Sequence, residues 1–266
     1  MSHFDLTSNI YTNQTPEQKI NTLAQHVLKN IKLIIDNVEY SLNEIEFYCY
    51  NTNHKDSYTH KDKDQLTNQE WYFHKYKNGT FKNGTYKGLD ITFGDIKSKS
   101  YGGILIRTIE KLSNHSTIIG PCNVVNHIIN ETGYNTIDEL VESLENNNVF
   151  NTKNKFHLKI SNNYDNRQIF DGPRVGLSLK YPEYLIKNYR FLKNPNDIPK
   201  YKDTIVSTLY SKGHSINDII KMTKISKKTV EKSISDFDDG KGLSDVDVNK
   251  TKKINVLYGY YYNKFN

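Results

Sequence analysis

Two carboxylates and one aromatic ring alternate along a stretch with the composition of a β-strand, Glu44-Ile45-Glu46-Phe47-Tyr48. Successive side chains of a strand point to opposite faces, so Glu44, Glu46 and Tyr48 are expected on the same face. A carboxylate can take a proton from water, and a flat ring can stack on a planar ligand. The stretch is therefore a candidate site. The alternative is a solvated strand face, with Ile45 and Phe47 packed inward.

Arginine occurs at only four positions, Arg107, Arg167, Arg174 and Arg190, in a chain where lysine is the usual cation. An Arg in this setting is a candidate for the planar, bidentate donor role that an ammonium group cannot fill. Arg107 ends an apolar run that predicts a central strand, so it needs a charge partner, which Glu44 could supply.

Histidine and aspartate side chains follow the acidic strand in a polar segment, at His54, Asp56 and His60, and His74 lies further along. They could line the same pocket as Glu46. Their ring nitrogens and carboxylate also suit a metal ion, but the spacing lacks the tight helical pattern of established zinc motifs. We therefore expect no metal and no cofactor, while a metal-dependent hydrolase or nuclease using His54, Asp56 and His60 stays an alternative.

Hydrophobic periodicity and capping signals predict the elements that must position these groups. A helix is predicted over residues 16–30, after the capping-box start Thr15-Pro16-Glu17-Gln18. Strands are predicted at residues 33–35, 40–50, 71–76, 89–93, 103–108, 156–160 and 174–179, and short helices after Gly120-Pro121 and from Thr136. A tandem pentapeptide, Asn78-Gly79-Thr80-Phe81-Lys82 followed by Asn83-Gly84-Thr85-Tyr86-Lys87, favours hairpin turns. Few helices against many strands predict an α+β fold.

The C-terminal part has a different composition. The proline-containing stretch at residues 195–199 is typical of a linker, so we predict one domain over residues 1–194 and a second segment over residues 195–266. Helices predicted at residues 202–211, after Ser215 and after Ser226 resemble a helix-turn-helix, whose last helix would present Lys227, Lys228 and Lys232 to DNA. The alternative is a small helical subdomain that packs on the main body. A Tyr-rich strand is predicted at residues 257–265.

Composition limits the class of protein. The chain has 266 residues, a net charge of +6, a pI near 8.9 and a mean hydropathy of -0.73. The charge permits a polyanionic partner, and no apolar run approaches the roughly 20 residues of a membrane span. Two cysteines are too few for a disulfide framework, and no secretory signal is visible. We expect an intracellular monomer without a membrane partner, in the nucleus, the cytoplasm or an equivalent viral replication compartment.

Six segments occur in an order that resembles the methylpurine-DNA glycosylases, also called alkyladenine glycosylases. They are Glu44-Ile-Glu46-Phe-Tyr48, Asp56-Ser-Tyr-Thr-His60, Gly103-Ile-Leu-Ile-Arg107-Thr-Ile-Glu110, Gly120-Pro121-Cys-Asn-Val, Gly172-Pro-Arg174-Val-Gly176-Leu-Ser178 and Tyr189-Arg190-Phe191. The resemblance covers residues 31–194. It implies a curled, mainly antiparallel sheet with flanking helices, and the excision of damaged purines that have been flipped out of double-stranded DNA.

The resemblance also implies roles for individual residues. Glu46 would deprotonate the attacking water, Tyr48 would stack on the extruded base, and Arg107 would lie near the water. His60 would contact the base, with His54 as the competing choice.

Two further arginines, Arg174 and Arg190, would support the fold or the DNA backbone. The DNA-wedging residue of the family has no clean match at residues 71–76 or 87–94, and Asn123 replaces a usual Lys. The chain is thus expected to be a divergent glycosylase that acts on alkylated or deaminated purines. A DNA-binding protein that kept the fold and lost catalysis is the other alternative.

Overall fold

The computed structural model describes residues 14–247, 251 and 253–265, and the chain divides into two compact units, Met1–Arg167 and Gln168–Asn266. The boundary predicted at residue 194 is wrong. Residues 168–194 belong to the second unit because Phe170 and Leu192 pack with Ile205 of the C-terminal helices in one apolar cluster. None of the helices in the described part of the chain combines the length and the apolar character needed to cross a membrane.

The first unit begins with the predicted helix, α1 (Pro16–Asn30), which buries one apolar face. The Thr15 hydroxyl accepts a hydrogen bond from the Gln18 backbone amide, and Gln18 Oε1 accepts one from the Thr15 backbone amide, so the capping box is complete. The chain passes directly into β1 (Ile31–Ile35) and turns at Asp36 and Asn37, both with positive φ, into β2 (Val38–Tyr50).

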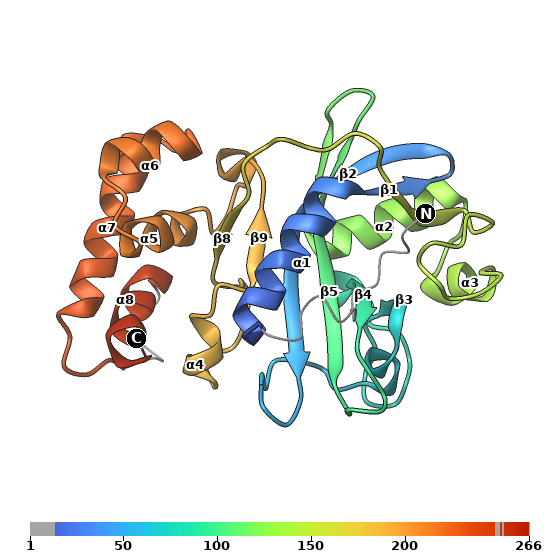
Figure 1. Ribbon diagram of the computed structural model, residues 1–266, viewed down its shortest axis with the longest axis horizontal. Helices are drawn as coiled ribbons and strands as arrows, with labels where there is room; N and C mark the ends of the chain where they lie inside the picture. Colours follow the sequence, from blue (N-terminus) through green and yellow to red (C-terminus); the bar gives the residue numbers. More distant parts are fainter. Residues whose placement is uncertain (1–13, 248–250, 252, 266) are drawn as a thin grey trace. The chain divides into compact units, whose positions relative to one another are not determined.

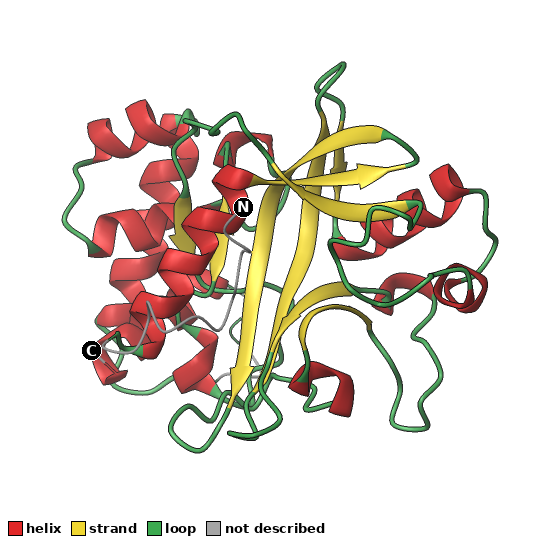
Figure 2. Ribbon diagram, turned by 45° about the vertical axis from the view of Figure 1, so that its right-hand side comes forward, coloured by secondary structure: helices red, strands yellow, loops and turns green. Residues whose placement is uncertain are grey.

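The sheet of this unit is antiparallel and has the order β3-β4-β5-β2-β1-β7, with β6 paired to β5. The remaining strands are β3 (Asn68–Phe73), β4 (Leu89–Phe93), β5 (Tyr101–Lys111), β6 (Thr117–Ile119) and β7 (Phe156–Ile160). Figure 2 shows the sheet curling, with helices beside it. The predicted α+β class with a curled antiparallel sheet and flanking helices is therefore confirmed.

Short helices complete the first unit. They are α2 (Pro121–Thr132), which packs on β5, α3 (Ile137–Glu142), and the 3-10 helices η2 (Lys63–Leu66) and η3 (Gly84–Tyr86). The tandem pentapeptide forms two different turns. The first Asn-Gly closes a small hairpin in which Lys75 pairs with Phe81, whereas the second leads into η3.

The second unit contains the hairpin β8 (Phe170–Gly172) and β9 (Arg190–Leu192), the short helices α4 (Pro182–Leu185) and η4 (Pro195–Asp197), and four longer helices. The longer helices are α5 (Asp203–Ser211), α6 (Ile216–Thr223), α7 (Lys227–Lys241) and α8 (Ile254–Phe265) (Figure 1). The strand predicted at residues 174–179 does not form, because Pro173 precedes it and Gly176 has a φ of 74°.

The Tyr-rich terminus is a helix, α8, and not the predicted strand. Leu257, Tyr258 and Tyr261 recur at helical spacing and pack around Phe237 of α7. The two helices approach closely at two glycines. A Cβ on Gly240 would lie 2.0 Å from the Val256 carbonyl oxygen, and one on Gly259 would lie 1.9 Å from that of Phe237. Helical packing against α7 therefore overrides the strand preference of tyrosine.

Candidate functional site

Two neighbouring strands bring Glu44, Glu46, Tyr48 and Arg107 together. On β5, Arg107 donates from Nε to Glu44 Oε1 at 3.1 Å and from Nη1 to Glu46 Oε2 at 3.3 Å. The Tyr48 hydroxyl donates to the same Glu46 oxygen at 2.8 Å. The register of β2 against β5 shifts on both sides of Glu44, and Thr108 donates to Glu44 Oε2 at 2.6 Å. One guanidinium thus joins two carboxylates.

This group, which we call the carboxylate cluster, is buried at its acidic end. The Glu46 residue is 0% exposed and Glu44 is 2% exposed, so the alternative of a solvated strand face is wrong. The side chain of Arg107 is 16% exposed, and Tyr48 is partly exposed. Burial disfavours the charge on Arg107, but the attraction of Glu46 and Glu44 outweighs it and raises the Arg107 pKa.

His60 lies in a second polar group, the histidine cluster, with Tyr72, His74, Lys82 and Asp90. Its Nδ1 lies 3.2 Å from the Tyr72 hydroxyl, and its Nε2 lies 3.2 Å from Lys82 Nζ. His74 Nε2 lies 2.9 Å from Asp90 Oδ1, and the two imidazole rings meet edge to face at 4.5 Å. Although His60 as a residue is exposed, its ring nitrogens face these groups. Desolvation of the ring, then repulsion from His74 and Lys82, lower the His60 pKa.

Strand register connects the two clusters. Tyr72 pairs with Asp90, Asp90 with Leu105, and Leu105 with Glu46. Because paired residues of neighbouring strands lie on the same face, the clusters are two ends of one row across four strands, separated by Leu105. The Asp90 carboxylate lies over Gly103, where a Cβ would be 2.4 Å from Asp90 Oδ2.

Of the residues weighed as metal ligands, the structure brings together His60 and His74, both in the histidine cluster. His54 and Asp56 are buried in the segment after β2, while His60 belongs to the histidine cluster. Within residues 14–247, 251 and 253–265, no three His, Cys, Asp or Glu side chains form a group suited to a metal ion.

Arg174 and Arg190 belong to the second unit and are 1% and 0% exposed. Arg174 donates to the Tyr184 carbonyl oxygen at 3.2 Å and lies over the Tyr189 ring, and Arg190 donates to the Tyr201 carbonyl oxygen at 2.9 Å. Buried guanidinium groups that bind backbone carbonyls stabilise loops. These contacts fit the expected support of the fold, and the expected contact with the DNA backbone stays a prediction.

The predicted basic helix has the expected form. Ser215 caps α6 and Ser226 caps α7, each by accepting a backbone hydrogen bond, and the turn between them passes through Lys224 with a φ of 59°. The side chains of Lys227, Lys228 and Lys232 are exposed on α7. Lys227 lies 3.6 Å from Glu231, a weak exposed pair.

Two groups of polar residues were not predicted. One contains Arg167, which binds Glu110 and Asp165 and also contacts Ser41 and Asn43 on β2. The scarcity of arginine pointed to Arg167, but its acidic partners lie 57 and 2 residues away and carry no sequence signal. The other is the Asp90–His74 pair, whose partners are 16 residues apart.

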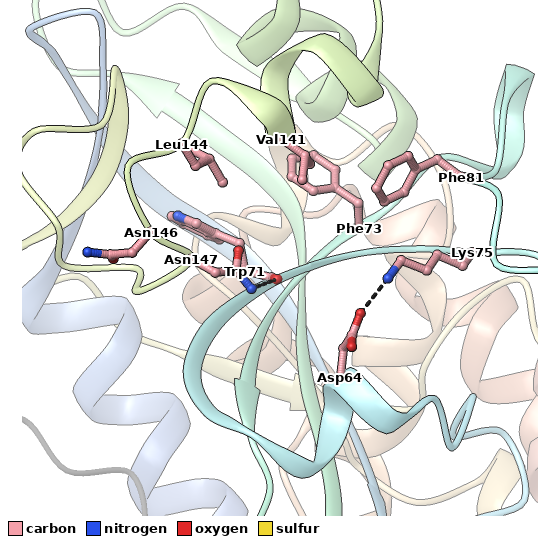
Figure 3. Close-up of a pocket in the computed structure, with 9 residues that line it drawn as sticks. All are labelled: Asp64, Trp71, Phe73, Lys75, Phe81, Val141, Leu144, Asn146 and Asn147. Atoms are coloured by element: carbon pink, nitrogen blue, oxygen red, sulfur yellow. Dashed lines mark hydrogen bonds and ion pairs between the residues drawn. The ribbon is translucent and has the colours of Figure 1, made fainter.

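A pocket lies on the opposite side of β3 from Tyr72. Figure 3 shows Trp71, Phe73 and Phe81 around it and the ion pair between Lys75 and Asp64. None of the residues expected to act on a base lines this pocket, so it is separate from both clusters.

No protein-family model matches the chain. The sequence is 38% identical over 202 residues to "Uncharacterized protein L759" of Acanthamoeba polyphaga mimivirus, and the match covers 71% of this chain and 92% of the mimivirus protein. The chain therefore belongs to the same family as this mimivirus protein.

Proposed function

We propose that the protein is a DNA glycosylase that hydrolyses the N-glycosidic bond of a flipped, damaged purine with a water activated by Glu46. The observation that supports this function is the convergence of an acid, a guanidinium and an aromatic ring in the carboxylate cluster. These three groups come from two strands and meet at one carboxylate oxygen. The reaction class needs a base for water, a cation beside it and a flat surface for the nucleobase.

For a cationic alkylated purine, the proposed reaction needs no other group. Glu46 accepts a proton from water as the water oxygen bonds to C1′ of the sugar. The bond from C1′ to the purine nitrogen breaks, and the electron pair of that bond leaves with the purine. An alkylated purine that carries a positive charge leaves as a neutral base. Arg107 holds the carboxylate in place from 3.3 Å, and Glu44 holds Arg107 from 3.1 Å.

Access to Glu46 depends on its two partly exposed neighbours. The carboxylate has no exposed surface, and the Tyr48 hydroxyl binds one of its oxygens. In this proposal, a base that stacks on Tyr48 turns its ring and moves this hydroxyl away, which opens the carboxylate to water. In this proposal, stacking and water activation are coupled through one side chain.

Duplex DNA is the proposed macromolecular partner. The capped helix α7 presents Lys227, Lys228 and Lys232, which could neutralise backbone phosphates while the N-terminal turn of the helix faces a groove. The same proposal places the protein wherever cellular or viral DNA is repaired, in the nucleus, the cytoplasm or a replication compartment.

The test measures release of free base from duplexes that carry one alkylated or deaminated purine, with and without EDTA. We expect release by the wild type that EDTA leaves unchanged. Glu46→Gln should abolish release while duplex binding persists. Glu39→Gln is the matched control, because Glu39 lies on the same strand and its carboxylate forms an exposed pair with Lys159. Undiminished release by Glu46→Gln would remove Glu46 from the role.

A second candidate is a DNA-binding protein that has lost catalysis. The complete burial of Glu46 favours it, because a buried carboxylate paired with Arg107 can serve the fold alone. This candidate predicts duplex binding without base release from any substrate.

A further inference from the structure

The tandem pentapeptide places two aromatic rings in opposite environments. Phe81, from the first copy, turns to the pocket beside Phe73, and Lys75 lies 5.5 Å from its ring centroid. Tyr86, from the second copy, is 70% exposed. In the part of the chain that the structure describes, its ring contacts no other ring and its hydroxyl makes no hydrogen bond. Packing therefore explains the first ring and not the second.

The backbone that carries Tyr86 is held in place. Gly84 has a φ of 55°, which only a residue without Cβ adopts easily, and the Gly84 carbonyl oxygen accepts a hydrogen bond from Cys122 Sγ at 2.9 Å. Lys87 donates to Asn126 of α2 at 2.8 Å, and the Tyr86 amide donates to the Asn83 carbonyl oxygen at 3.2 Å. A ring on a fixed turn loses little freedom on binding.

The segment around Tyr86 is strongly basic. Residues 75–87 contain four lysines, Lys75, Lys77, Lys82 and Lys87, and no acidic residue. Lys75 pairs with Asp64, whereas Lys77 is exposed and has no ion-pair partner among the residues that the structure describes. The charge selects an anionic partner.

We propose that residues 76–87 form a contact site for a nucleic-acid strand, in which Tyr86 stacks on an accessible base and Lys77 binds a backbone phosphate. Exposed aromatic rings among lysines are the combination that binds single strands, because every base has a flat face and every nucleotide a charge. The inference rests on the proposed function in one respect, since a glycosylase must expose bases of the strand that it holds. It adds a binding surface away from Glu46.

Fluorescence anisotropy of a labelled single-stranded oligonucleotide of mixed sequence tests the site. Tyr86→Ala should weaken binding at least fivefold, since stacking on one base contributes about 1–3 kcal/mol. Tyr86→Phe should bind as the wild type, because the ring and not the hydroxyl stacks. Tyr164→Ala is the matched control, because Tyr164 is likewise an exposed tyrosine, at 54%, and Lys29 lies over its ring.

The salt dependence of oligonucleotide binding tests the role of Lys77. Lys77→Gln should reduce the slope of log affinity against log salt by about 0.7, the contribution of one phosphate contact in a single strand. Unchanged binding by Tyr86→Ala, or an equal loss in Tyr86→Phe, would overturn the proposal. So would a wild type that binds anionic lipid vesicles and no oligonucleotide. If the protein releases base but Tyr86→Ala binds the oligonucleotide as the wild type does, the contact site alone is refuted. If binding depends on Tyr86 but no base is released, only the proposed glycosylase activity is refuted.

Discussion

Replacing Arg107 by glutamine should destabilise the first unit strongly. The substitution leaves Glu44 and Glu46, whose side chains are 2% and 0% exposed, without their shared cation. Removing one partner of a buried ion pair costs about 3–5 kcal/mol. The lower end, about 3 kcal/mol, applies here because the Arg107 side chain is 16% exposed and water can partly replace it.

Urea unfolding followed by tryptophan fluorescence measures this cost. Trp71 is the chain's one tryptophan and is 2% exposed within the first unit, so it reports that unit. Lys159→Gln is the control, because it breaks an exposed pair with Glu39 and should cost less than about 1 kcal/mol. Combining Arg107→Met with Glu44→Gln and Glu46→Gln should recover most of the loss, since no buried charge remains.

Acid should reduce the cost of Arg107→Gln. Without the guanidinium, two buried carboxylates lack their cation, and burying an unpaired charge is costly. Protonation at low pH removes that charge and with it the cost. The difference in the free energy of unfolding between Arg107→Gln and the wild type should therefore be smaller at pH 4 than at pH 7. A cost below about 1 kcal/mol at pH 7, or one that does not change with pH, would refute the assignment of a buried ionic cluster.

Three further predictions concern other parts of the chain. Burial disfavours the charged Glu110 carboxylate, but hydrogen bonds from Arg167, His115 and Asn43 outweigh it and lower the Glu110 pKa to about 2. Glu110 therefore stabilises the fold above its ordinary pKa of 4.5, and this stabilisation is lost as the pH falls through about 2. The urea midpoint of Glu110→Gln should decline less than that of the wild type over this range, and parallel curves would contradict the reasoning. Gly103→Ala should cost about 1–3 kcal/mol in the same assay, because the new methyl group would meet Asp90 Oδ2 at 2.4 Å. Replacing Lys227 and Lys228 by glutamine should lower the salt slope of duplex binding by about 1.8, and an unchanged slope would remove α7 from the DNA interface.

Local signals predicted many elements of the first unit. The capping box placed α1 at Pro16–Asn30, and hydrophobic runs placed β4 and β7 at the bounds that the structure has. These elements succeed because neighbouring residues decide them. The C-terminal helix α8 could not be predicted in this way, since tyrosine favours strands and only the contact of Tyr258 with Phe237 selects the helix.

The domain boundary shows the same limit. Prolines at positions 195 and 199 suggested a linker, but Pro195–Asp197 forms the 3-10 helix η4, and Pro195 and Ile198 are buried. The actual division after Arg167 has no proline or glycine signal beside it. It depends on which distant residues share a core, as Phe170 and Ile205 do.

Alternation along β2 was enough to place Glu46 and Tyr48 side by side, and the end of an apolar strand was enough to single out Arg107. Burial of both carboxylates was not predictable, because polar residues at alternate positions usually face solvent. The separation of His60 from Glu46 also depends on strand order. Asp90 of β4 and Leu105 of β5 lie between them in the cross-strand row, and no local pattern reveals that order.

The glycine contact between α7 and α8 has a consequence for how α7 could read a groove. Gly240 lies near the C-terminal end of α7, whereas Lys227, Lys228 and Lys232 occupy its first two turns. The glycine contact holds the C-terminal end of the helix, and Val230 and Ile234 pack its N-terminal half on α5 and α6. The reach of the lysine side chains, and not tilting of the helix, would then determine how many phosphates are engaged. Deleting the chain from residue 254 onward would remove α8 and its contact with α7. Phe237 would then be exposed, and α7 would carry an apolar surface that favours aggregation.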